Sequence, residues 1–393
     1  MASAQVASPT QTMQGIVVPN AVIAPTEFFK RTRRITFPFV SNKSFVGLGA
    51  SDTFSFLQTG IVAGVSVRLV GSVTTVHGTG TVATNARWPY DLVKKLRVSA
   101  NGQSNLISCS GWKLKARDMT ALEPISDRGV TQSINGANVS QGTLSLASES
   151  WGLGQQQSAI TDGTYNFDIL LYVPIAFDRK TLVGAIFAQT AATDLTLSID
   201  WATSSDLFTL TGTATAAVAC NIQAEVIAFS IPEENGQIII PDLSSFHGLI
   251  ENRYTAVGNG DNDIRLVGQG VGRQLMRVMW QTWNGATPQA PLTLNDTNYG
   301  QVSWKFGGND VPEYWISARA LRENMERIFN SDLGGAEGFG VWDWAAESAF
   351  RDSIDEGAAT ELRISLNYPT GLTLTNPAVE YVQETIFAGA VGV

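Results

Sequence analysis

Hydrophobic and polar residues alternate along several short stretches of this chain. Between Leu195 and Trp201 every second residue is apolar, and the residues between them are threonine, serine and aspartate. The stretch from Leu362 to Tyr368 repeats the pattern with Ile364 and Leu366. A period of two places one side of a strand in a core and the other in water. These stretches therefore predict half-buried β-strands.

A strand, a segment of helical spacing and a second strand follow one another twice in the sequence. In the bridging segments Leu182 and Ile186 are four residues apart, as are Phe350 and Ile354. This spacing predicts a helix in each bridge. The two units cover residues 167–174, 178–188 and 194–201 in the first half, and 339–342, 344–354 and 361–368 in the second.

A hairpin followed by a helix is also present in both halves. Asn101-Gly102 is a strong two-residue turn signal, because both positions tolerate positive φ. A helix around Trp112 and Met119 follows it, and in the second half Gly307-Gly308 precedes a helix around Met325. The shared order of hairpin, helix, strand, helix and strand predicts one β domain that is duplicated in tandem. The fold class is therefore all-β, with short helices between the late strands.

The domain limits follow from composition. Residues 1–27 are small and polar and contain three prolines, which predicts an arm that is ordered only when something else holds it. The first β domain spans residues 28–230, and the second spans residues 231–393 and begins with a linker of six residues. Residues 125–163 are rich in Ser, Gly, Gln, Asn and Thr and have no long counterpart in the second half, which predicts a surface excursion.

Composition excludes several classes of protein. Charged residues make up 16%, hydrophobic residues 44%, and the formal net charge is −9, which argues against broad nucleic-acid affinity for the chain as a whole. Cys109 and Cys220 are far apart and have no metal or redox spacing, so we expect buried free thiols. No signal peptide and no apolar run of membrane-spanning length is apparent. We expect a soluble protein made in a reducing compartment.

The densest positive cluster is Lys30-Arg31-Thr32-Arg33-Arg34, directly after the arm. Arg31, Arg33 and Arg34 suit contact with phosphate or lipid head groups. A solvated strand edge explains the same residues about equally well. Both interpretations stay open at the level of the sequence.

Searches for catalytic and metal-binding patterns find little. His77 and His247 each lie beside a glycine and have no partner at a recognisable spacing, so we expect surface or capping histidines. The run of Gly268, Gly270 and Gly272 matches no phosphate-binding loop and predicts a bend. The segment 261–263, Asp-Asn-Asp, lacks a full calcium loop, and we expect an acidic turn. The sequence predicts no metal, cofactor or catalytic residues.

A glycosidase needs two carboxylates at a set separation. Candidate carboxylates and tryptophans exist, but no carboxylate pair stands out, and tryptophans of an all-β chain usually fill cores or interfaces. The candidates are Asp310, Glu313, Asp343 and Glu347, with Trp280, Trp283, Trp304 and Trp315 nearby in sequence.

Several short pieces of the sequence together match one known family in order and spacing. They are residues 171–177, 181–186 and 195–197 (Leu-Tyr-Val-Pro-Ile-Ala-Phe, Thr-Leu-Val-Gly-Ala-Ile and Leu-Thr-Leu), Ser110-Gly111-Trp112, and more loosely residues 367–377. These pieces resemble the major capsid proteins of tectiviruses, the tailless icosahedral double-stranded DNA phages that enclose a membrane. The resemblance covers most of the chain in order and spacing, with identity confined to short pieces, and residues 125–163 and much of 237–300 are unmatched.

The resemblance implies two eight-stranded jelly rolls and a capsid subunit without enzymatic activity. It implies a homotrimer of nearly hexagonal outline that tiles the shell of a virion, assembled in the host cytoplasm, with penton and minor capsid proteins as further partners. It also implies that the arm lies on the inner side near a membrane, which gives Arg31, Arg33 and Arg34 a lipid-facing role. The tail 389–393 would be conformationally variable.

Two alternatives remain from the sequence. One is a two-domain β-sandwich that binds or cleaves carbohydrate, with Trp151 or Trp283 as a sugar platform. The other is a spike or receptor-binding protein of a similar virus, which would occur in tens rather than hundreds of copies per particle.

Overall fold

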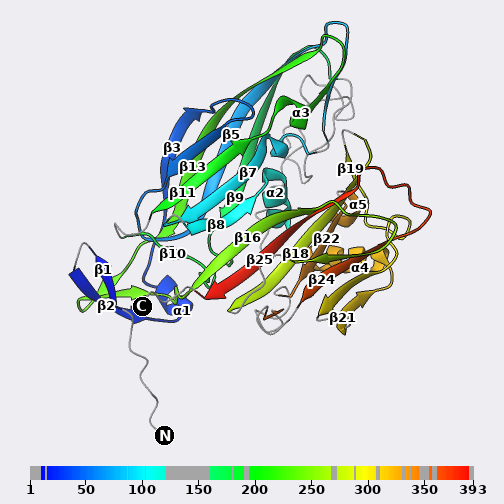
Figure 1. The fold of residues 1–393 in the computed structure, drawn as a ribbon. Coiled ribbons are helices and arrows are strands. Elements are labelled where there is room, and N and C mark those ends of the chain that lie inside the picture. The colour runs from blue at the N-terminus through cyan, green and yellow to red at the C-terminus, as the bar shows by residue number, and fades with distance from the viewer. Residues whose placement is uncertain are drawn as a thin grey trace.

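The chain folds into two β-barrels that lie side by side (Figure 1). The computed structural model describes residues 10–13, 16–85, 87–101, 103–120, 160–178, 180–189, 194–266, 272–286, 289–306, 310–329, 333–336, 338–344, 354–355 and 361–388. Predictions made for other positions lie outside the described residues. These are the excursion up to residue 159, Trp151, Gly102, Gly268, Gly270, Gly307, Gly308, Glu347 and the tail 389–393.

The first barrel consists of two facing four-stranded sheets. One sheet has the order β3 (Arg34–Ser44), β13 (Thr215–Phe229), β5 (Ile61–Val76) and β9 (Gly163–Pro174). The other has the order β4 (Ser51–Ser55), β11 (Leu195–Trp201), β7 (Val93–Ala100) and β8 (Gln103–Cys109). In the lettering B to I along the chain, these are the BIDG and CHEF sheets of a jelly roll.

The second barrel repeats this strand order. Its BIDG sheet is β16 (Ser245–Tyr254), β25 (Ala378–Ala388), β18 (Arg273–Asn284) and β22 (Phe339–Asp343). Its CHEF sheet is β17 (Gly260–Arg265), β24 (Leu362–Tyr368), β20 (Val302–Phe306) and β21 (Asp310–Trp315). The expected pair of tandem eight-stranded jelly rolls is confirmed.

In each barrel a helix connects strand F to strand G. These helices are α2 (Gly111–Met119) and α4 (Ala318–Phe329), as the spacing of Trp112 and Met119 and of Leu321 and Met325 predicted. Both begin after a serine that caps the helix, because Ser110 Oγ accepts from Lys113 N and Ser317 Oγ accepts from Ala320 N. No described helix is long and apolar enough to cross a membrane.

The remaining elements are short. They are η1 (Tyr90–Leu92), α3 (Ser204–Leu207), α5 (Leu333–Ala336), β6 (Val82–Thr84) paired with β12 (Phe208–Leu210), and the edge pieces β10 (Ile186–Phe187), β19 (Ala290–Pro291) and β23 (Ile354–Asp355).

The helix predicted over residues 178–188 is wrong. Turns and strand β10 occupy this segment, and Leu182 has a φ of 56°, which a right-handed helix does not contain. Leu182 and Ile186 are buried in different places, so their helical spacing is coincidental. Most of the helix predicted over residues 344–354 lies outside the described residues, but Ile354 belongs to strand β23 rather than to a helix.

The segment 261–263 is also not a turn, because it lies within strand β17 and pairs with β24. Asn262 is buried there, and its side-chain amide donates to Gly258 O and Gly260 O. Among the described residues no group of three or more His, Cys, Asp or Glu side chains is arranged to hold a metal ion.

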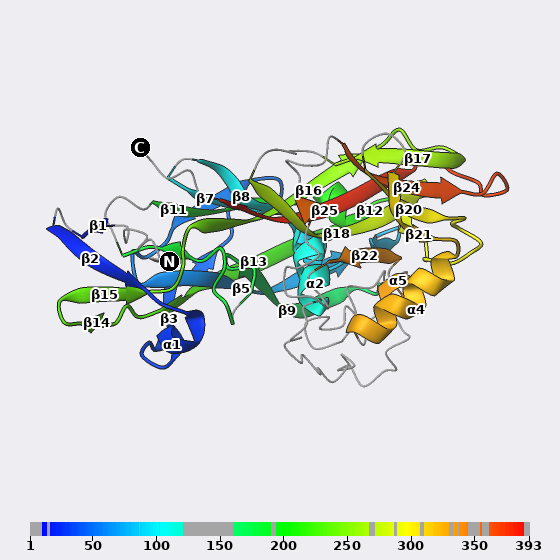
Figure 2. The ribbon, with the colours of Figure 1, turned by 90° about the horizontal axis from the view of Figure 1, so that it is seen from below.

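The described part of the N-terminal arm, residues 10–13 and 16–27, includes strands of a separate small sheet at one end of the first barrel (Figures 1 and 2). Strands β1 (Thr10–Met13) and β2 (Ile16–Val22) form a hairpin, and β2 pairs in parallel with β15 (Gln237–Ile240), which pairs with β14 (Glu233–Glu234). Helix α1 (Pro25–Phe29) buries Phe28 against Ile61, Leu182 and Ile238. The limits 1–27, 28–230 and 231–393 stay a prediction.

The cores are built as the alternation predicts. Leu195, Leu197, Ile199 and Trp201 are buried in the first barrel, and Leu362, Ile364, Leu366 and Tyr368 in the second. Trp304 is fully buried and lies within 5.8 Å of Trp342 and 4.9 Å of Trp344, measured between ring centroids. Cys109 and Cys220 are buried free thiols, as expected.

Candidate functional site: the junction between the barrels

Helix α2 lies between the two barrels, and both of its long faces are buried (Figures 1 and 2). Leu114 and Ala116 join the hydrophobic core, whereas Trp112, Lys113 and Arg117 reach strands of the second barrel. The ring of Trp112 stacks on Phe339, and its Nε1 donates to Gln281 at 3.0 Å. Helix α2 therefore attaches the first barrel to the second.

Glu384 on strand β25 is the centre of a buried ion cluster at the junction. Its Oε1 accepts from Arg117 Nη2 at 2.7 Å and lies 2.9 Å from His247 Nε2. Arg277 Nη1 lies 3.5 Å from the other carboxylate oxygen, and Arg277 also pairs with Asp343. Burial by itself would raise the pKa of Glu384, but Arg117 and Arg277 hold that pKa well below its usual range.

His247 therefore differs from the surface or capping histidine expected from the sequence. Its side chain is fully buried, and its Nδ1 lies 2.9 Å from the Pro174 carbonyl oxygen of the first barrel. The neighbouring Gly184 approaches so closely that an added Cβ would lie 2.6 Å from His247 Cβ. His77 is partly exposed, with Nδ1 3.8 Å from Asp162.

A second buried cluster surrounds Lys113 on α2. Lys113 Nζ donates to Gln281 at 2.8 Å and lies 3.6 Å from Glu380 Oε2. Burial lowers the pKa of Lys113 to about 8, while Glu380 and Glu251 oppose that change. Glu251 accepts hydrogen bonds from the backbone and hydroxyl of Ser110 at 2.7 and 3.1 Å, and burial raises its pKa.

The backbone also crosses the junction. Strand β8 of the first barrel pairs in parallel with β16 of the second, with Ile107 opposite Leu249 and Ser108 opposite Ile250. The CHEF sheet of the first barrel and the BIDG sheet of the second therefore form one continuous sheet. Helix, strand pairing and buried ion pairs together fix how the two barrels are oriented.

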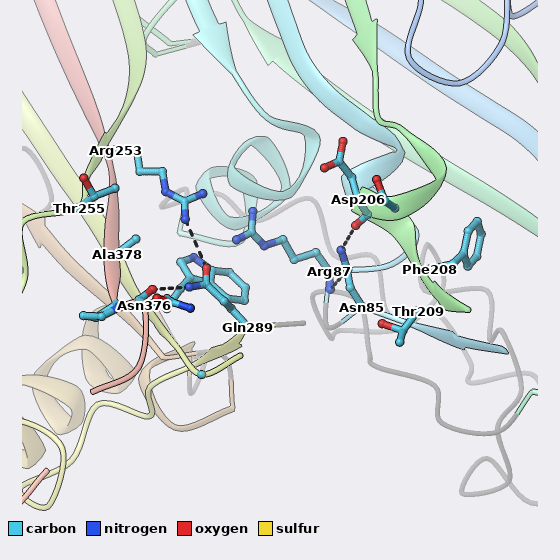
Figure 3. Close-up of a pocket in the computed structure, with 14 residues that line it drawn as sticks. Asn85, Arg87, Asp206, Phe208, Thr209, Arg253, Thr255, Gln289, Asn376 and Ala378 are labelled. Carbon is cyan, nitrogen blue, oxygen red and sulfur yellow. Dashed lines mark hydrogen bonds between the residues drawn. The ribbon is translucent and has the colours of Figure 1, made fainter. Parts of the chain in front are cut away.

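An open groove of about 750 Å³ lies between the barrels beside this junction (Figure 3). Arg87 and Arg253 enter it from opposite sides, and both are within 3.5 Å of Glu380. The Arg87 guanidinium lies 3.6 Å above the ring of Trp283. Both arginines share the one carboxylate of Glu380 with Lys113, so the groove continues the charge network of the junction. Its described lining offers no pairing of nucleophile and base for catalysis.

The candidate carbohydrate residues whose side chains the structure describes do not form a site; Trp151, Glu347 and the side chains of Asp310 and Glu313 lie outside that description. Trp280, Trp283 and Trp304 are at most 1% exposed, and Asp343 is buried in its ion pair with Arg277. Trp315 is partly buried against the core. The expectation that these tryptophans fill cores and interfaces is confirmed.

The basic cluster lies at the end of the first barrel that carries the arm. Arg31, Arg33 and Arg34 are exposed, and Arg31 pairs with Glu234 of strand β14. Thr32 is held by the carbonyl oxygen of Ser230, and Arg33 N donates to Ser230 Oγ at 2.9 Å. The three guanidinium groups therefore share one end of the molecule with the arm.

Sequence reasoning missed the ion clusters of the junction. One signal was available: Glu380 and Glu384 lie four residues apart, and so on the same face of the apolar strand β25. Charges on an otherwise apolar strand indicate buried pairs. Their partners come from residues 87, 113, 117, 247, 253 and 277, which no local pattern brings together.

Asp91 in η1 provides a test by pH. Burial raises the pKa of Asp91 to about 7, although Arg87 and Asn85 oppose the change. The unfolded carboxyl titrates near pH 3.8, so its ionisation costs stability progressively as pH rises from about 4 to 7. Asp91→Asn should change the free energy of unfolding more favourably at pH 8 than at pH 4, and we expect the difference between the two effects to be roughly 2–4 kcal/mol. Urea unfolding at both pH values measures this, and an equal effect at both would contradict the prediction.

Comparisons with known proteins identify the fold. No family model matches this sequence, and no curated protein matches it. Solved structures do match along nearly the whole chain. The crystal structure of the STIV MCP, from Sulfolobus turreted icosahedral virus, is 14% identical with a TM-score of 0.59 and covers 91% of this chain and 96% of that chain. The PBCV-1 virus capsid is 11% identical, with a TM-score of 0.55 and coverage of 92% and 96%. The major capsid protein P2 from bacteriophage PM2 is 10% identical, with a TM-score of 0.50 and coverage of 92% and 99%. The chain has the fold of these proteins.

Proposed function

We propose that this chain is a major capsid protein that assembles as a homotrimer and tiles an icosahedral shell. The observation that carries the proposal is the buried junction, which joins two barrels of the same topology in one rigid orientation. The likeness in fold to viral capsid proteins supports it. Its role is structural rather than catalytic, and its place is the virion.

The physical argument for a trimer rests on the duplicated barrel. A closed ring needs each subunit to present one surface to a complementary surface on the next. Three chains with two barrels each give a ring of six barrels, so the outline is nearly hexagonal and packs without gaps on a facet. Penton and minor capsid proteins would then occupy the positions that a six-fold outline cannot fill.

Size-exclusion chromatography with light scattering tests the assembly. We expect a particle of three times the chain mass of 42.1 kDa, and negative-stain images with a hexagonal outline. Obligate interfaces of this kind bury roughly 2,000–5,000 Å², so the trimer should persist at micromolar concentration. A monomer at that concentration would contradict the proposal. Hundreds of copies per particle distinguish a shell subunit from a spike.

We also propose that the arm faces an internal membrane and that Arg31, Arg33 and Arg34 contact lipid head groups. Two observations support this proposal: the three arginines are exposed, and they lie together beside the arm. Each basic side chain contributes about 1 kcal/mol to binding an anionic surface. Arg33→Ala/Arg34→Ala should therefore weaken binding to phosphatidylserine vesicles roughly 30-fold.

Flotation with these vesicles measures that binding. The matched control is Lys94→Ala/Lys95→Ala, which removes the same charge from strand β7 and should leave flotation unchanged. If the two double variants bind equally, the arginine cluster has no specific role at the membrane.

A further inference from the structure

Among the described residues, one sheet edge of the second barrel is unpaired and one helix packs only on its own barrel, whereas their counterparts in the first barrel contact the other barrel. Strands β8 and β21 are the F strands, and α2 and α4 are the helices that follow them. β8 pairs with β16, the B strand of the second barrel. Among the described residues, β21 ends its sheet, and so does β3, the B strand of the first barrel. Strands β8 and β16 therefore pair inside the chain, whereas the equivalent edges of β21 and β3 have no pairing strand among the described residues.

Burial differs in the same way at equivalent positions. Leu96 opposite Cys109 and Val302 opposite Trp315 are matching pairs of strands E and F. Counting from them, Ser108 corresponds to Tyr314. Ile316 directly precedes Ser317, which caps α4 as Ser110 caps α2. Ser108 and Ser110 are 5% and 8% exposed beneath the second barrel, whereas Tyr314 is 50% and Ile316 77% exposed. Ile316 is the most exposed large hydrophobic residue that the structure describes.

The helices show the same contrast. Every residue of α2 from Gly111 to Arg117 is buried. In α4 only the face formed by Ala318, Leu321, Met325 and Phe329 is buried, against its own barrel. The opposite face carries exposed Arg319, Glu323 and Arg327, with Arg319 and Glu323 paired to each other at 3.0 Å. In Figure 2, α2 lies in the middle of the molecule and α4 at its margin.

The outer face of the first BIDG sheet is the counterpart of the surface that receives α2. It carries Leu170, which is 41% exposed, and the exposed carboxylate of Glu225. A groove of about 640 Å³ crosses this face along Val70 and Ala219. At its edge Pro38 of β3 is exposed. The second barrel presents Glu384 and Glu380 to α2 from the equivalent sheet.

We propose that α4 and the edge of β21 dock on β3 and the outer BIDG face of the first barrel in a second copy of this chain. The contact between chains thus repeats the junction within the chain. One junction geometry, used six times, closes a ring of three chains. This inference rests on the proposed trimer and assigns its two contact surfaces.

The binding partner is a second copy of this chain, because the same kind of contact already exists within the chain, between α2 and β8 of the first barrel and the second barrel. The charges of α2 pair across the junction, whereas those of α4 pair along their own helix. A helix surface that satisfies its own charges stays soluble before assembly. The exposed Ile316 and Leu170 then supply apolar area that becomes buried in the trimer.

Cysteine cross-linking tests which edges meet. Ile316→Cys is combined in one chain with Thr36→Cys or Pro38→Cys, and the purified assembly is oxidised. We expect at least one pair to give a covalent trimer on a non-reducing gel, while each single variant gives none. Cys109 and Cys220 are buried and should not interfere. An intact trimer in which no pair cross-links would overturn the proposed surfaces.

Charged substitutions give an independent measurement. Ile316→Asp and Leu170→Arg should each raise the trimer dissociation constant at least 100-fold without changing the circular dichroism spectrum of the chain. Leu210→Asp, on strand β12 at 37% exposure, is the control and should assemble as the wild type does. If the wild-type chain is a monomer, the proposed function fails. If the wild type and both variants form equally stable trimers, only the assigned surfaces fail.

Discussion

Replacing Glu384 with alanine should lower the free energy of unfolding by about 3–5 kcal/mol, because it leaves buried cations without a counter-charge. Arg117 and Arg277 are 7% and 5% exposed and both lie within 3.5 Å of this carboxylate, and His247 is fully buried beside it. Two of these partners come from the second barrel and one from the first. The substitution therefore weakens the second barrel and its attachment at once.

Urea unfolding of the purified chain measures the effect, with Glu233→Ala as the control. Glu233 is exposed on β14, so its removal should change stability by less than about 0.5 kcal/mol. Since the pKa of Glu384 is lowered in the folded chain, its contribution is present above the unfolded pKa near 4.5 and is lost as pH falls toward the folded value. Glu384→Gln should accordingly show a weaker loss of stability in acid than the wild type. Equal stability of Glu384→Ala and Glu233→Ala would contradict this account.

Replacing Trp112 with alanine should have a similar cost, about 3–5 kcal/mol, because a large side chain is removed from a buried contact. Its ring stacks on Phe339 at 6.1 Å between centroids, and its Nε1 hydrogen bond to Gln281 joins the barrels. Trp112→Phe keeps most of the apolar contact and should lose only the hydrogen bond, roughly 1 kcal/mol.

Trp304→Ala is the matched control, since Trp304 is equally buried but lies inside the second barrel. Both variants should be destabilised, and hydrogen exchange distinguishes them. Trp112→Ala should speed exchange in α2 and at the β8–β16 pairing, whereas Trp304→Ala should speed it in β20 and β24. If Trp112→Ala leaves the protection of α2 and of the β8–β16 pairing from hydrogen exchange unchanged, then α2 does not hold the barrels together.

The buried ion clusters cost folding free energy, because their charged groups lose their hydration. Two buried charges gain from each other only when geometry and further hydrogen bonds repay their dehydration. Glu384 meets this condition at Oε1, which Arg117 and His247 contact, whereas the buried Oε2 has the charge of Arg277 at 3.5 Å but no hydrogen bond. We interpret the clusters as setting one orientation of the barrels, because an apolar contact alone tolerates sliding whereas directional ion pairs do not. In the function proposed above, a shell subunit needs that single orientation to tile repeatedly.

The sequence by itself determined the local structure and the duplication. Alternation at residues 195–201 and 362–368 predicted two strands with one buried face, and the hairpin and helix signals near Asn101 and Trp112 recurred around Met325. These features depend on residues close in the chain, so periodicity reports them. The same local reasoning failed at Leu182, whose spacing matched a helix although its backbone is left-handed.

Only the tertiary structure decided what lies between the barrels. Ser110 and Glu251 are 141 residues apart, and Arg117 and Glu384 are 267 apart. No pattern of period two or 3.6 connects such positions, and His247 therefore looked like a surface residue. Strand periodicity fixes which face of a strand is buried but leaves open which barrel covers it. The pairing of β8 with β16, and the edges of β21 and β3 that stay unpaired within the described part of the chain, follow from long-range packing alone.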